Sequence, residues 1–104
     1  MSAKKLIYDA IIRKSSQYPW METFFITDQE ILAASKEKTS KRQIIQAARS
    51  LKPVLTLYDT QWYNSKRIRK YAFNSYELAK LVPLERNLNN HQFIKDGLKL
   101  FMKL

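Results

Sequence analysis

Cationic side chains gather in one third of this sequence, where they could bind a polyanion. Residues 36–70 hold ten of the nineteen lysines and arginines but only two acids, so they account for eight of the ten net positive charges. The first 35 residues balance four bases against four acids, and the last 34 carry five against three. The ten cations are Lys36, Lys38, Lys41, Arg42, Arg49, Lys52, Lys66, Arg67, Arg69 and Lys70. A positive field concentrated in this way favours a polyanion, and nucleic acid is the commonest one.

The first part of this basic segment predicts a helix over about 40–51. Ser40 and Gln43 stand three residues apart, which is the spacing of a capping box at a helix N-terminus. One face of this helix is apolar and is expected to be buried: Ile44, Ile45, Ala48 and Leu51. The opposite face forms an exposed ridge with the spacing i, i+4 and i+7: Arg42, Gln46 and Arg49.

The residue types on this helix suit contact with DNA. Arginine can make paired hydrogen bonds to guanine and glutamine to adenine, in a major groove wide enough for a helix. Free backbone N–H groups and the helix dipole favour a phosphate at the helix N-terminus. The candidate DNA-binding residues of this helix are therefore Thr39, Ser40, Lys41, Arg42, Gln43, Gln46 and Arg49. The competing interpretation is an ordinary solvated helix surface, since arginine and glutamine are common there.

A hairpin is predicted next, with strands at 54–58 and 66–73 and a polar turn over 59–65. Its outgoing strand begins with four cations in five positions, Lys66, Arg67, Arg69 and Lys70. Such an arm can follow the phosphate backbone or enter the minor groove. Trp62 and Tyr63 fall at the predicted tip, out of reach of a core, which indicates contact with a ligand. Three other aromatics are expected in the core: Tyr58, Tyr71 and Phe73.

The remaining segments predict five elements in addition to this helix and hairpin. A helix is expected at 4–14, with Ser2 as a possible N-cap, and a short strand at 22–26. Capping boxes at Thr27–Glu30 and Asn74–Glu77 predict helices that run to about 35 and to just before Pro83. A last helix begins near residue 89 or 90 and has an apolar stripe of Phe93, Ile94, Gly97, Leu100, Phe101 and Leu104.

The order of these elements over residues 27–73 resembles a winged helix-turn-helix. The resemblance rests on the segments TDQEILAA at 27–34 and TSKRQII at 39–45, followed by the hairpin. It implies a mostly α fold with a small β-hairpin (α+β) in one domain of residues 1–104. The helix-turn-helix would span about 27–51, the wing about 54–73 and additional C-terminal helices about 75–104. The chain departs from many such proteins at the turn, where it has Lys36-Glu37-Lys38 rather than a glycine.

Composition argues against other classes of function. The sequence has no cysteine and a single histidine, His91, so we expect no metal site, no cofactor and no histidine-based catalysis. No pair of carboxylates has catalytic spacing, and an enzyme is not expected. No apolar run approaches the length of about 20 residues that a membrane span needs. The lack of cysteine fits a reducing cytoplasm.

Three functions remain open at this point. The first is a regulator that binds duplex DNA, rather than RNA, through the 40–51 helix and the basic wing. The second is a single-stranded-DNA-binding accessory protein in replication or transfer of a mobile element, since bases stack on aromatics inside positive grooves. The third is a winged-helix adaptor between proteins. The last helix could pack on the first helix, or pair two copies in a homodimer through Phe93, Gly97 and Phe101.

Overall fold

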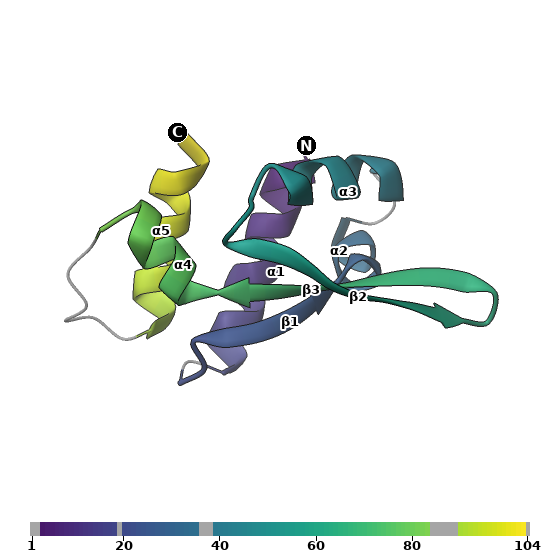
Figure 1. Cartoon of the computed structure of the whole chain (residues 1–104), viewed down its shortest axis with the longest axis horizontal. Coiled ribbons are helices and arrows are strands. Elements are labelled where there is room, and N and C mark those ends of the chain that lie inside the picture. The colour runs from purple at the N-terminus through teal and green to yellow at the C-terminus, as the bar shows by residue number, and fades with distance from the viewer. Residues whose placement is uncertain (1–2, 19, 36–38, 84–89, 104) are drawn as a thin grey trace.

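The computed structural model describes residues 3–18, 20–35, 39–83 and 90–103. Within them it has an α+β fold of five helices and one three-stranded antiparallel sheet, as predicted at this level (Figure 1). The elements in chain order are α1 (Ala3–Gln17), β1 (Thr23–Thr27), α2 (Asp28–Ser35), α3 (Lys41–Arg49), β2 (Leu55–Tyr63), β3 (Lys66–Asn74), α4 (Ser75–Leu81) and α5 (Asn90–Lys103). The predicted cap at Ser2, the turn at 36–38 and Leu104 lie outside the described residues.

The sheet has the strand order β1-β3-β2. β2 pairs with β3 along its whole length, but β1 pairs only with the inner part of β3, from Asn74 to Lys70. The outer part of the β2–β3 hairpin is therefore two-stranded, and it projects from the body on the side away from α4 and α5 (Figure 1). This projection lengthens the molecule, which measures 44 × 24 × 21 Å.

The hairpin turn is much shorter than predicted. The predicted turn over 59–65 is wrong, because β2 continues to Tyr63 and only Asn64 and Ser65 connect the strands. Both residues have positive φ, 48° and 63°, as the two central residues of a type I′ turn require. Threonine, tryptophan and tyrosine favour strands, and pairing with β3 holds the polar residues between them in the ladder.

The core lies between the sheet and the helices that cover one of its faces. α1 contacts α2, α3 and α5, and its predicted stripe is buried: Leu6, Ile7, Ala10 and Ile11. Ile31 of α2 and Ile44 of α3 are fully buried beside it. On the sheet, the rings of Phe24 and Phe73 stack with centroids 4.9 Å apart, which joins β1 to β3.

Two of the predicted capping boxes are present. Thr27 Oγ1 accepts from the Glu30 N–H while Glu30 accepts from the Thr27 N–H, and Ser40 and Gln43 are paired in the same way. The box predicted at Asn74 is only half formed. Asn74 Oδ1 accepts from the Tyr76 N–H, but the Asn74 N–H already donates to the Val54 carbonyl and Glu77 binds Lys80 instead.

The last helix packs inside the monomer. α5 contacts α1 and α4, and His91 Nδ1 lies 2.7 Å from Oγ of the buried Ser15 on α1. The predicted stripe is correct at Phe93, Ile94 and Gly97, but Leu98 is buried and Leu100 is exposed. Phe93 and Gly97 are thus covered in the folded monomer, with Phe101 packed partly against the core, and a homodimer through these residues is not supported.

Candidate nucleic-acid interface

The ridge predicted on α3 is exposed. On the opposite side of the helix, Ile44, Ala47 and Ala48 are buried and pack against the core. The sequence pattern had not predicted Ala47 as a core residue. The side chains of Arg42, Gln46 and Arg49 are exposed and make no hydrogen bond or ion pair with another described residue. Three side chains able to pair with base edges or phosphates therefore stand along one line of a rigid helix.

The N-terminus of α3 uses some of the predicted site residues to form the helix. The side-chain oxygen of Gln43 accepts from Thr39 Oγ1 at 2.6 Å and from the Ser40 N–H at 3.3 Å. Ser40 Oγ in turn accepts from the Gln43 N–H. Gln43 thus acts as a capping residue, with only its amide N–H groups left for a ligand. The first helical N–H groups of Lys41 and Arg42 have no partner within a helix and could meet a phosphate.

A lysine joins α3 to the hairpin. Lys41 Nζ donates to the backbone carbonyl of Arg67 on β3 at 2.8 Å. Thr39, Lys41 and Lys66 also line one cavity of about 310 Å³ between α2, α3 and β3. The N-terminus of the predicted DNA-reading helix and the outer part of the basic hairpin, 26 positions apart in sequence, are therefore neighbours in the structure.

The outer hairpin presents aromatic and basic side chains together. Trp62 pairs with Arg67 and Tyr63 with Lys66 across the ladder. The Arg67 guanidinium lies 5.1 Å from the centre of the Trp62 ring, within the range of a cation–π contact. Both aromatics are 66% exposed, as predicted, although they belong to the end of β2 and not to a loop.

Arg69 is turned toward the interior of the protein. Its Nη1 lies 3.8 Å from Oδ2 of Asp28, a fully buried carboxylate at the start of α2 that accepts no hydrogen bond in the described part of the chain. The Arg69 side chain is only 20% exposed. The sequence groups Arg69 with the cations of the wing that could contact DNA, whereas in the structure its guanidinium is turned toward a buried charge. The sequence gives no signal for this pair, since Asp28 has the ordinary position of a first-turn helix acid.

Lys70 lies apart from the other predicted residues. Its Nζ is 4.5 Å from the Phe25 ring centre and 6.0 Å from that of Tyr58, and these rings are 4.8 Å apart. Tyr58, predicted in the core, is 64% exposed because the ladder shifts register between Leu57 and Asp59. Phe25 was not identified from the sequence as an exposed aromatic. The signal was present, because adjacent Phe24 and Phe25 in one strand must face opposite sides of the sheet.

Comparisons with known proteins identify no relative of this chain. No protein-family model, curated protein or solved structure matches this chain. Within the described ranges, no helix combines the length and apolar character of a membrane span. The same ranges contain no group of three or more metal-ligating side chains. The candidate interface consequently rests on the α3 ridge and on the hairpin next to it.

Proposed function

We propose that this chain is a winged helix-turn-helix protein that binds duplex DNA. The sequence of elements from α1 to β3, with the strand order β1-β3-β2, resembles that architecture, to which α4 and α5 are added. The observation that carries the proposal is the exposed, unpaired ridge of Arg42, Gln46 and Arg49 beside a projecting basic hairpin. A surface helix and an arm of this kind can engage a groove and the backbone at its edge together.

In this proposal α3 enters the major groove and the hairpin contacts the backbone. The guanidinium groups of Arg42 and Arg49 suit guanine edges or phosphates, and the amide of Gln46 suits adenine. The N-terminus of α3 faces a phosphate, and the hydrogen bond from Lys41 to the Arg67 carbonyl fixes the angle between helix and hairpin. Lys66 and Arg67 then neutralise backbone phosphates or reach into the minor groove.

The first test compares duplex and single-stranded DNA. A labelled random sequence of about 30 nucleotides is titrated in both forms across a salt series, since phosphate contacts make affinity fall steeply with salt. Tighter binding of the duplex, with a steep salt dependence, is expected and would justify a search for a preferred sequence. Absence of binding to either form at low salt would reject the proposal and favour a protein–protein adaptor.

A single-strand-binding function is the second candidate, and the exposed aromatics favour it. Four exposed aromatic side chains lie on strands β1 and β2: Phe25, Tyr58, Trp62 and Tyr63. Bases can stack on such rings beside cations, and each stack is worth about 1–3 kcal/mol. In this case Trp62→Ala would weaken single-strand binding by that amount, whereas Tyr76→Ala on α4 would leave it unchanged. Tighter single-strand binding would then point to an accessory in replication or transfer of a mobile element.

A further inference from the structure

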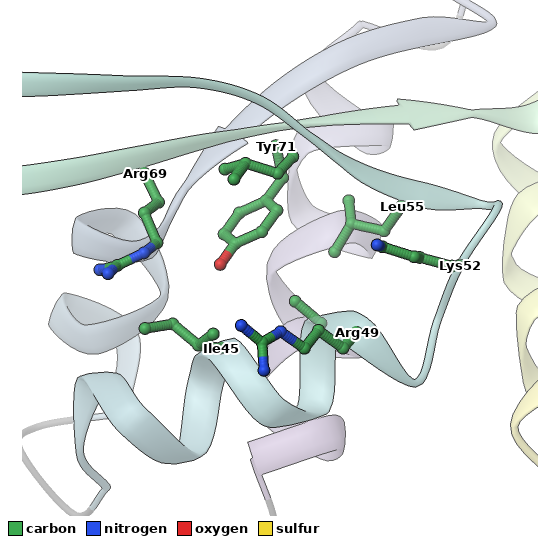
Figure 2. Close-up of a pocket in the computed structure, with 8 residues that line it drawn as sticks. Ile45, Arg49, Lys52, Leu55, Arg69 and Tyr71 are labelled. Carbon is green, nitrogen blue, oxygen red and sulfur yellow. The ribbon is translucent and has the colours of Figure 1, made fainter.

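A basic cavity lies behind the proposed DNA-reading helix, between α3 and the helix-covered face of the sheet (Figure 2). Its volume is about 190 Å³, several times the roughly 30 Å³ that one water occupies in the liquid. It is smaller than the pockets of roughly 300–1,000 Å³ that hold drug-sized ligands. The lining residues are Ile45, Ala48, Arg49, Lys52, Leu55, Leu57, Arg69 and Tyr71.

Three cations converge on this cavity, and no acid lines it. The side chains of Arg49 and Lys52 make no hydrogen bond or ion pair with another described residue. Arg69 enters from β3, and Asp28, its ion-pair partner at 3.8 Å, does not line the cavity. Even with Asp28 counted, two positive charges remain uncompensated around a small space, and an anion bound there would remove their mutual repulsion.

Tyr71 adds a neutral hydrogen-bond donor. Its side chain is 4% exposed, and its hydroxyl points toward α3 between Arg69 and Arg49 (Figure 2). The hydroxyl forms no hydrogen bond with another described residue, and it is not among the fully buried polar atoms, so it is open to the cavity and free to donate to a ligand there. Burial raises the pKa of Tyr71 above its ordinary value of 10.0, so the phenol keeps its proton at neutral pH and can donate.

We propose that this cavity binds a phosphate group, held by Arg49, Lys52 and Arg69 and by the Tyr71 hydroxyl. Guanidinium and ammonium groups form short, charge-assisted hydrogen bonds with phosphate oxygens. The apolar wall of Ile45, Leu55 and Leu57 provides room for a small ring or sugar attached to that phosphate. This site shares Arg49 with the proposed DNA-reading ridge. It goes beyond the proposed DNA function, because Lys52, Arg69 and Tyr71 bind the phosphate behind α3 without contact with a groove.

The test uses inorganic phosphate and phenyl phosphate, with sodium chloride at equal ionic strength as the blank. Backbone amide NMR shifts are followed in the wild type and in Lys52→Ala, Tyr71→Phe and Lys4→Ala. Lys4 is an exposed lysine on α1 outside the cavity, so its variant is the matched control. Saturable shifts at residues 45–52 and 69–71 are expected, with affinity about tenfold weaker in Lys52→Ala and unchanged in Lys4→Ala.

Equal affinity in Lys52→Ala and Lys4→Ala, or no saturable shift at these residues, would overturn the site. Lys52 is exposed, so its variant decides the test even if Tyr71→Phe does not fold.

Two sources of phosphate are then separated with duplex DNA. If the cavity receives a backbone phosphate, inorganic phosphate competes with the duplex and Lys52→Ala weakens duplex binding. If it receives a small phosphorylated molecule, phenyl phosphate binds more tightly than inorganic phosphate and duplex binding by Lys52→Ala is unchanged. A protein that binds phenyl phosphate but no DNA would keep this site and lose the DNA proposal, so the two can fail separately.

Discussion

At the scale of single residues, the α3 ridge and the hairpin cations should have different effects on DNA binding. Arg42→Ala or Gln46→Ala is expected to weaken binding to a preferred duplex by about 1–3 kcal/mol and to reduce discrimination between sequences. The physical reason is that these exposed side chains can pair with base edges. The measurement is a set of dissociation constants for the preferred duplex and for single-base variants, after a site has been selected from random sequences.

Lys66→Ala is the matched comparison for these ridge variants. Lys66 is exposed at the hairpin, where it can contact the backbone, so its loss should weaken binding to all duplexes about equally. Equal losses on every sequence from both Arg42→Ala and Lys66→Ala would contradict base reading by α3. The charge of the segment would then act only as a general attraction for DNA.

The buried pair of Asp28 and Arg69 predicts unequal effects on stability. Arg69→Met removes the cation and leaves a fully buried carboxylate uncompensated, which should cost about 3–5 kcal/mol of unfolding free energy. Asp28→Asn should cost about 1 kcal/mol, because Arg69 is partly exposed and can turn toward water. Urea unfolding of both variants measures the difference.

The double variant Asp28→Asn/Arg69→Met tests the cause of that difference. It should recover most of the stability that Arg69→Met loses, since no charge then stays buried without a partner. Equal losses from the two single variants, or additive losses in the double variant, would contradict this account.

Local pattern explains which residues were predicted correctly. Helical spacing placed Arg42, Gln46 and Arg49 on one exposed ridge, because a buried face determines the opposite one. The contacts of Asp28 with Arg69 and of Lys41 with the Arg67 carbonyl depend on how α2 and α3 pack against β3. The spacing of residues within either helix does not predict such long-range contacts.

At the scale of elements, the two-residue hairpin turn makes a specific prediction. Asn64 and Ser65 both have positive φ, which asparagine tolerates and serine does not. Ser65→Gly should therefore raise the unfolding free energy by about 1 kcal/mol, since glycine has no Cβ and Asn-Gly is the preferred type I′ pair. Thermal and urea unfolding measure the change.

Ser16→Gly on α1 provides the matched control for that substitution. Ser16 is an exposed serine in the last turn of α1 with a negative φ, where glycine is expected to lower stability by about 0.5 kcal/mol. A loss of stability from Ser65→Gly as well would contradict the positive φ of the turn.

Elements whose ends carry caps were predicted better than elements defined by pairing. The boxes at Thr27–Glu30 and Ser40–Gln43 fixed the starts of α2 and α3 because each box is local. The outer part of β2 was predicted as a turn, since its polar residues look like a loop until β3 pairs with them. Strand length depends on the partner strand, which lies beyond the reach of a local pattern.

At the scale of the whole molecule, the sequence predicted an α+β fold but could not predict which faces of its elements pack against each other. The alternation in 66–73 separated Lys70 from Arg69, yet only the packed sheet shows that one faces Phe25 and the other a buried carboxylate. Likewise, the stripe of α5 indicated one buried face without indicating its partner. α1 and α4 cover that face, which removes the basis for a dimer through Phe93.

The arrangement of charge over the molecule predicts how DNA affinity depends on salt. Among the described cations of α3 and the hairpin that make no ion pair with a described residue, five belong to the surface proposed to face DNA: Lys41, Arg42, Arg49, Lys66 and Arg67. If about four to five of them neutralise phosphates, log K should fall against log salt with a slope of about −4, since each contact contributes roughly −0.9 on a duplex. Fluorescence anisotropy at four or five salt concentrations measures this slope.

Removing charges from opposite sides of the protein tests whether the slope arises from this surface. Removing Arg49 and Lys66 together should lower its magnitude by about 2, because each lost phosphate contact removes about one unit. Removing Lys99 and Lys103 of α5, which also takes away two charges, should leave it unchanged, since α5 lies at the opposite end of the molecule from the hairpin (Figure 1). Equal changes from the two pairs would mean that net charge alone attracts DNA, and that neither α3 nor the hairpin forms a defined interface.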